Sequence, residues 1–242
     1  MRTNRLIMGT GVSIDIPDAA PPIFEKTFER LEEIDAKFST YKPESEVSRY
    51  GRSEIAEEDL SRELKAVIKA CKAAEKATQG YFSAWAAKSF DPSGYVKGWA
   101  ISEAAKIIKR AGHRTFCIGI GGDILAASNS DKIWNIGIQD PADKSKILNK
   151  LSIKNGAIVT SGTSVRGLHI INPKTGRPAD SILSMTVVGP DIIDADVLAT
   201  AAFVQGESGL NFIAGDAKSY EALVVDKTGK ISMTSGMSKL LA

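Results

Sequence analysis

Cysteine is scarce in this sequence, which limits the chemistry available to it. Only Cys71 and Cys117 occur among 242 residues, and both lie inside apolar patterns. Two cysteines do not make the disulfide framework of a small secreted domain. We therefore expect two reduced, buried thiols in a reducing compartment, in preference to a disulfide or a metal pair.

A charge excess and a long apolar run are missing too. The 31 basic and 29 acidic residues are interspersed and leave a formal charge of +2, so no basic patch predicts nucleic acid or an anionic membrane as a partner. The longest uncharged apolar run, Val197 to Val204, is far shorter than the ~20 residues of a membrane span. Met1 to Leu6 is polar and lacks an apolar stretch of signal-peptide length. We expect a cytoplasmic, unanchored protein.

The composition that remains is that of an ordinary globular protein, with 43% apolar and 25% charged residues. Helices are predicted where apolar residues recur at helical spacing, at 21–38, 61–78, 97–111, 195–204 and 210–217. Strands are predicted from alternating or short apolar runs, chiefly at 6–16, 115–120, 124–127, 134–139, 152–159, 168–171, 185–188 and 222–225. Helices cluster early and strands late, which predicts an α+β fold in a single domain over residues 1–242.

Reactive side chains are concentrated between Thr160 and Thr200. Asp196 and Thr200 are four residues apart on a predicted helix, so their oxygens project from one face. Such hard oxygen ligands suit Mg²⁺ or Ca²⁺. The alternative is a helix-capping Asp196 with a buried Thr200 bonded back to its own helix. His169 fits an acid/base catalyst or a satisfied strand residue equally well by spacing.

Two further segments could contact a ligand. Gly119, Gly121 and Gly122 follow one another at a strand end and could either expose N–H groups to phosphate or form a tight turn. Asp123 directly after them could bind ligand or cap that turn. Earlier in the chain, several aromatic rings lie close to Asp91 and Lys97, which is more stacking surface than a plain loop needs.

These pieces, taken in order along nearly the whole chain, resemble the ApbE family of FAD:protein FMN transferases. Any one of the matching segments is unspecific, but their shared order is specific. The segments are Met8 to Thr10, Phe38 to Tyr41 with Ser45 to Arg49, Asp91 to Gly98, Gly121 to Asp123, Asp140 and Pro141, Thr160 to Gly162, His169 to Gly176, and Asp194 to Thr200.

The resemblance implies an α+β fold with N-terminal helices packed on mixed or antiparallel sheets. It implies binding of FAD and a divalent cation, usually Mg²⁺, and transfer of FMN to a threonine or serine hydroxyl in the flavinylation motif of a partner flavoprotein, with release of AMP. Carried over by position, His169 is the acid/base residue, and Gly94 (through its carbonyl), Asp196 and Thr200 are the metal ligands. The implied FAD contacts are Met8, Tyr41, Phe82, Asp91, Lys97, Asp123 and Ile170.

This chain also departs from the long family members. The segment between the aromatic rings and Lys97 is much shorter, Asn172 stands where many members carry Asp, and Gly119 stands where many carry Asn. A short cytoplasmic subgroup with a cytoplasmic flavoprotein target fits these differences. Two other activities are compatible with the same residues: Mg²⁺-dependent hydrolysis of FAD to FMN and AMP, and FAD binding without chemistry.

Overall fold

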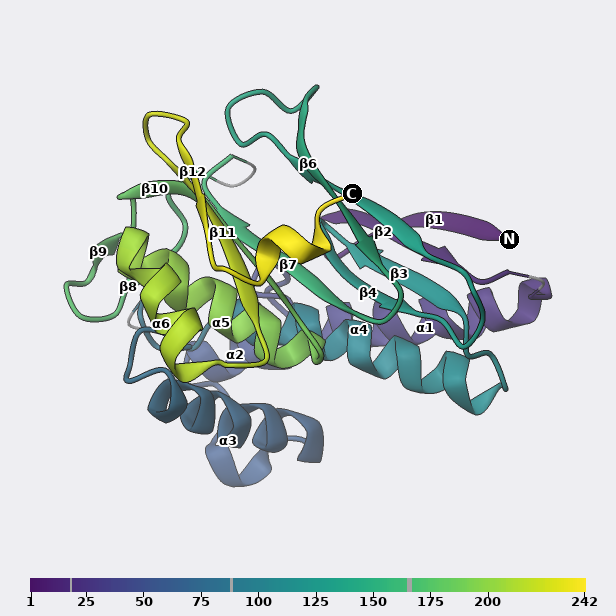
Figure 1. Ribbon diagram of the computed structural model, residues 1–242. Coiled ribbons are helices and arrows are strands. Elements are labelled where there is room, and N and C mark those ends of the chain that lie inside the picture. The colour runs from purple at the N-terminus through teal and green to yellow at the C-terminus, as the bar shows by residue number, and fades with distance from the viewer. Residues whose placement is uncertain (18, 88, 165–166) are drawn as a thin grey trace.

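A large antiparallel sheet forms the centre of the chain in the computed structural model, which describes residues 1–17, 19–87, 89–164 and 167–242 (Figure 1). Its strand order is β1-β2-β3-β4-β7-β10-β11-β12, and every neighbouring pair is antiparallel. The strands are β1 (Arg2–Ile7), β2 (Thr10–Asp15), β3 (Phe116–Ile120), β4 (Asp123–Ala127), β7 (Gly156–Gly162), β10 (Ile182–Gly189), β11 (Glu221–Asp226) and β12 (Ile231–Met233).

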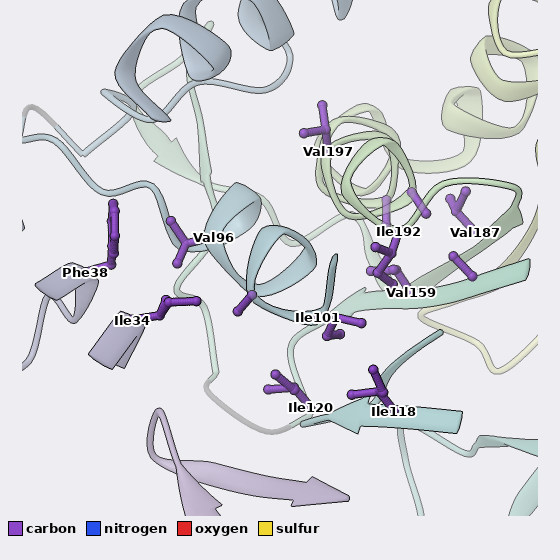
Figure 2. Close-up of a cluster of buried hydrophobic side chains, with 14 of the residues drawn as sticks. Ile34, Phe38, Val96, Ile101, Ile118, Ile120, Val159, Val187, Ile192 and Val197 are labelled. Carbon is purple, nitrogen blue, oxygen red and sulfur yellow. The ribbon is translucent and has the colours of Figure 1, made fainter. Parts of the chain in front are cut away.

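Helices cover one face of this sheet (Figure 1). They are α1 (Pro21–Phe38), α2 (Glu46–Gly51), α3 (Arg62–Ala77), α4 (Ser93–Arg110), α5 (Ile192–Gln205) and α6 (Gly209–Asp216), with short 3₁₀ turns η1 (Glu57–Asp59), η2 (Gly206–Ser208) and η3 (Met237–Leu240). α4 and α5 contact the sheet directly, and α1 packs on α4. Figure 2 shows Ile101 of α4 and Ile192 of α5 among Ile118 and Val159 of the sheet. The observed fold is therefore α+β, as predicted.

The opposite face of the sheet carries a second, smaller core. Side chains of neighbouring residues in a strand point to opposite faces, so Val159 of β7 joins the helix-covered core while Ile158 joins the other one. That second core is closed by a separate two-stranded sheet, β5 (Trp134–Gln139) and β6 (Ile147–Ile153), and by η3. A third pair, β8 (Ile171–Asn172) and β9 (Arg177–Pro178), stands apart.

Several predicted boundaries were wrong. The predicted strand 152–159 is not one strand, because the chain reverses between β6 and β7. The side chain of Asn155 accepts a hydrogen bond from Ser128 N (2.8 Å) and donates one to Ser128 O (3.1 Å), and Gly156 has φ +150°. Of the predicted strand 168–171 only Ile171 is in a strand. The first predicted strand, 6–16, overlaps two strands that a turn at Met8 and Gly9 separates, with φ of 56° and 67°.

Both cysteines are free thiols, Cys71 buried and Cys117 half-buried. Burial raises the pKa of the Cys71 thiol to about 12 and that of Cys117 to about 11, so neither is a thiolate at neutral pH. No helix in the described part of the chain is long and apolar enough to cross a membrane.

Helices α4 and α5 approach each other closely at Gly98. A Cβ added there would lie 2.7 Å from the carbonyl oxygen of Ile192, 3.0 Å from the Cα of Ile193 and 3.1 Å from the Cβ of Asp196. Two of these three atoms belong to the backbone, which cannot move aside as the end of a flexible side chain can. The absence of a side chain at Gly98 therefore allows the two helices to pack at this short distance.

We expect Gly98→Ala to lower the free energy of unfolding by about 1–3 kcal/mol, because overpacking outweighs the better helix propensity of alanine. Gly51, the last residue of α2, is the matched control because an added Cβ there meets nothing within 4 Å. Gly51→Ala should be neutral or stabilise by less than ~1 kcal/mol. Urea denaturation of both variants measures the difference, and equal effects would refute the packing argument.

Candidate active site

An open cavity lies where α4, α5, the ends of several sheet strands and the loop before β8 meet. It has a volume of about 270 Å³, just below the range of roughly 300–1,000 Å³ for small-molecule sites. Its wall mixes aromatic, glycine, hydroxyl and charged residues. The cavity contains eight of the predicted site residues: Phe82, Asp91, Gly94, Lys97, His169, Ile170, Asp196 and Thr200.

Three predicted residues lie outside that lining. Asp123 is 1% exposed and sits behind the wall, where it forms an ion pair with Lys97. Met8 occupies the β1–β2 turn and packs partly against the main core. Tyr41 follows α1 and is 78% exposed. The structure therefore gathers the catalytic and metal candidates in one place, and it leaves Met8 and Tyr41 as predicted contacts away from the cavity wall.

Asp196 is held in the interior of α5 and does not cap it. The cap is Asp191, whose side chain accepts hydrogen bonds from Ile193 N (2.8 Å) and Asp194 N (3.1 Å). Asp196 is 1% exposed and accepts a hydrogen bond from Gly98 N at 2.9 Å. The helix-capping alternative for Asp196 was therefore wrong.

The environment of Asp196 disfavours its charge. Burial raises the pKa of the Asp196 carboxyl to about 7; the nearby Lys97 ammonium and the Gly98 N–H act against this increase, whereas Asp123 adds to it. A buried carboxylate of this kind is stabilised by a cation at its free edge. The position is therefore suited to a metal ion that replaces the proton.

Thr200 lies one helical turn after Asp196 and completes an oxygen-rich corner. Its Oγ1 is 3.4 Å from Ser161 Oγ of β7, and a Cβ added to Gly94 would lie 3.1 Å from the same Oγ1. Among the described residues, no group of three or more His, Cys, Asp or Glu side chains could hold a metal ion. One carboxylate, hydroxyls and a nearby backbone fit Mg²⁺, which commonly takes one or two carboxylates and completes its shell with water and phosphate oxygens.

Lys97 and Asp123 join α4 to the start of β4. The Lys97 ammonium contacts Asp123 Oδ2, and Asp123 Oδ1 accepts a weak hydrogen bond from Thr160 N at 3.4 Å. Removing one partner of a buried pair is strongly destabilising because a charge is left uncompensated. Asp123 thus fixes the position of the Lys97 ammonium, the one ammonium group that the described residues place in the cavity wall. Asp123 directly follows Gly121 and Gly122, whose positive φ angles of 59° and 111° are those of a tight turn.

His169 lies in the exposed part of the wall and is oriented by its own loop. Its Nδ1 is 3.0 Å from the carbonyl oxygen of Gly167. A carbonyl oxygen only accepts, so this contact requires the proton on Nδ1 and leaves Nε2 as the basic nitrogen. The geometry is that of a side chain able to accept a proton at the mouth of the cavity.

Two parts of the site were missed by the sequence analysis. Lys174, at the tip between β8 and β9, donates to the carbonyl of Gln79 at 2.6 Å and lies 5.4 Å from the centre of the Tyr81 ring, so it links the His169 loop to the aromatic wall. Residues 136–139 of β5 also line the cavity, next to Asp140 and Pro141, which the sequence analysis named only as a segment of the family resemblance. Nothing local marks either contribution, since both depend on packing between distant segments.

Comparison with known proteins decides the family. The sequence model of the ApbE family matches residues 8–89 and 84–224, most of the chain. The chain belongs to the ApbE family. Solved structures agree in fold: the ApbE protein of Thermotoga maritima MSB8 superposes with a TM-score of 0.85 at 22% identity, and the flavin transferase ApbE of Vibrio cholerae with 0.84 at 23%. Both alignments cover 100% of this chain and 99% of the other.

Curated relatives match over part of their length. An FAD:protein FMN transferase of Vibrio cholerae is 33% identical over 150 residues, which are 57% of this chain and 45% of the relative. One of Treponema pallidum is 31% identical over 137 residues, 52% of this chain and 38% of the relative. The matched segments thus span less than half the length of these ApbE relatives.

The buried Asp196 predicts a pH dependence of stability in this ApbE-family chain. Its pKa in the folded protein, about 7, lies above the ordinary 3.8, so the folded state holds this proton more tightly than the unfolded state. As the pH rises from about 4 to 7 with EDTA present, loss of the proton therefore lowers the free energy of unfolding, by roughly 1–4 kcal/mol from this group.

Asp196→Asn should remove that contribution and flatten the profile between pH 4 and 7, as measured by urea denaturation in EDTA. Asp131→Asn, at an exposed carboxyl, is the control and should keep the wild-type profile. If Asp196→Asn and the wild type show the same slope, the carboxyl is not held in a desolvated position.

Proposed function

We propose that this chain is an FAD:protein FMN transferase that uses Mg²⁺ and moves FMN from FAD to a threonine or serine hydroxyl of a partner flavoprotein, releasing AMP. One observation supports this above the others: the imidazole of His169, the ammonium of Lys97 and the buried carboxyl of Asp196 line the same cavity in a member of the ApbE family. The named relatives of Vibrio cholerae and Treponema pallidum are FAD:protein FMN transferases.

The proposed reaction is a phosphoryl transfer, which requires positioning and charge neutralisation more than covalent help from the protein. The acceptor hydroxyl oxygen bonds to the phosphorus on the FMN side of the diphosphate, and the bond from that phosphorus to the bridging oxygen breaks, so AMP leaves. Nε2 of His169 takes the hydroxyl proton. Lys97, fixed by Asp123, places a positive charge beside the diphosphate.

Asp196 and Thr200, with the carbonyl of Gly94, are the residues that would hold Mg²⁺. The bound ion supplies charge neutralisation at the diphosphate and at the leaving AMP. Phe82, Asp91 and Ile170 provide the wall against which the dinucleotide lies, and Met8 and Tyr41 would contact it only beyond that wall. A cytoplasmic acceptor fits the sequence expectation of a cytoplasmic protein.

The direct test incubates the purified protein with FAD, Mg²⁺ and a flavoprotein that a known ApbE-family enzyme modifies. The expected result is covalent flavin fluorescence on a denaturing gel together with AMP release, both abolished by EDTA. AMP and free FMN without covalent flavin would show a hydrolase, and FAD binding without either product would show a non-catalytic binder. The known enzyme serves as the positive control.

We expect His169→Ala to retain FAD binding and to lose about 10²- to 10⁴-fold in turnover, since a positioned base contributes that much. FAD affinity is measured by fluorescence quenching and turnover by AMP release. His113→Ala, at the other histidine and outside the cavity lining, is the matched control and should behave as wild type. Full turnover in His169→Ala would remove this residue from the proposed chemistry.

A further inference from the structure

Strand β5 pairs with β6 along one edge only, among the residues that the structure describes. Consecutive residues of β5 and the turn after it, from Ile136 to Pro141, line the cavity. Side chains of neighbouring strand residues point to opposite faces, so a row of consecutive lining residues means that the backbone edge of β5 borders the cavity.

The hydrogen-bond register shows which backbone groups that edge presents. Gly137 lies opposite Lys150, and the carbonyl of Lys150 accepts a hydrogen bond from Ala242 N at 2.8 Å, on the side away from β5. Gly137 and Lys150 are therefore a non-hydrogen-bonded antiparallel pair, whose N–H and C=O groups point outward. Asp140 N donates to Lys146 O at 3.0 Å, so by alternation Gln139 also directs its N–H and C=O away from β6.

The two outer edges of this small sheet are treated differently. The outer edge of β6 is covered by the end of the chain, since Leu241 forms a bridge to Leu151 and Ala242 bonds to Lys150. The outer edge of β5 has no strand on it in the described chain, although exposed strand edges are usually covered or blunted. Gly137 adds no side chain that would obstruct an approach to it.

We propose that this β5 edge docks the acceptor flavoprotein, whose segment carrying the threonine or serine adds to it as an extended strand. The inference rests on the proposed transferase function. Gly137 and Gln139 lie about 7 Å apart along the strand, and backbone pairing at both would hold the segment in register. Alternate side chains of the segment would then point toward the cavity and toward solvent. One of the inward positions presents the hydroxyl to the cavity that contains His169.

The acceptor is the occupant that the proposed reaction demands. A hydroxyl on a folded protein reaches a recessed diphosphate only on a segment that enters the cavity, and strand addition supplies affinity through the main chain while leaving most side chains unconstrained. A second copy of this chain on the same edge would close the cavity mouth against any acceptor. FAD bound along the β5 edge would occupy the same backbone groups and leave no room for an acceptor strand. The experiments below distinguish the acceptor, a second copy and FAD.

The matched pair Gly137→Pro and Gly137→Ala tests the edge. Both add a Cβ, which would meet the movable Ile147 side chain at 3.0 Å, but only proline removes the outward N–H. Proline is tolerated where the N–H faces away from a partner strand. We expect the KM for an unmodified 12-residue peptide that carries the flavinylation motif to be about tenfold higher in the proline variant than in the alanine variant, with FAD affinity equal in the two.

An equal peptide KM in the two variants would overturn the proposal. AMP release at saturating peptide is measured on the same samples, so a failure of the flavin chemistry, seen as a lost kcat in both variants, is distinguished from a failure of docking, seen as a raised KM in the proline variant alone. Thermal unfolding shows whether both variants are folded; if Gly137→Pro is unfolded, Gln139→Pro against Gln139→Ala replaces the pair.

Amide hydrogen exchange of the wild type gives the second readout, with FAD, Mg²⁺ and the same peptide with valine in place of the acceptor threonine. Slower exchange at Gly137 and Gln139 only when peptide is present supports the proposal. Protection by FAD alone would assign the edge to the dinucleotide, and protection that grows with protein concentration would assign it to a second copy. Either result, or no protection with saturating peptide, overturns it.

Discussion

The site depends on two buried carboxylates, Asp123 and Asp196, that interact with the same ammonium group, that of Lys97. Asp123 and Asp196 are each 1% exposed, on β4 and α5, and Lys97 of α4 contacts the first and favours the charged form of the second. Negative charge at this depth persists only beside compensating groups. The sheet and the two helices are therefore tied together at the point where we propose that a cation and a diphosphate bind.

The rest of the site is arranged around that rigid junction. Gly98 lets α4 and α5 approach and donates its N–H to Asp196, so the same close contact positions both Lys97 and the Asp196–Thr200 pair. His169, in contrast, is exposed and oriented by its own loop. The Asp123–Lys97–Asp196 part of the cavity is thus built into the core, whereas His169 stands in the exposed wall, where the proposed reaction needs its proton acceptor to meet the incoming hydroxyl.

Local patterns in the sequence predicted what depends on local geometry. The four-residue spacing of Asp196 and Thr200 correctly predicted a shared helix face, and apolar periodicity predicted α1, α3 and the α+β fold. The turn between β6 and β7 was missed although its dipeptide Asn155–Gly156 is a local turn signal; the bonds of Asn155 to Ser128 add to it in the fold. The Lys97–Asp123 pair, the link from Lys174 to Gln79 and the β5 wall join segments far apart in the sequence, so spacing carries no signal for them. Family resemblance supplied the residues whose roles no spacing reveals, and two of these, Met8 and Tyr41, lie away from the cavity wall.

The central claim is that Asp196 and Thr200 hold a divalent cation against a diphosphate that reaches toward His169. A crystal structure with FAD and Mn²⁺, with the metal located by its anomalous scattering, tests it most directly. The account predicts a metal peak within about 2.5 Å of oxygens of Asp196 and Thr200, with the diphosphate between that peak and the imidazole. A metal bound elsewhere, or FAD lying outside this cavity, would contradict it.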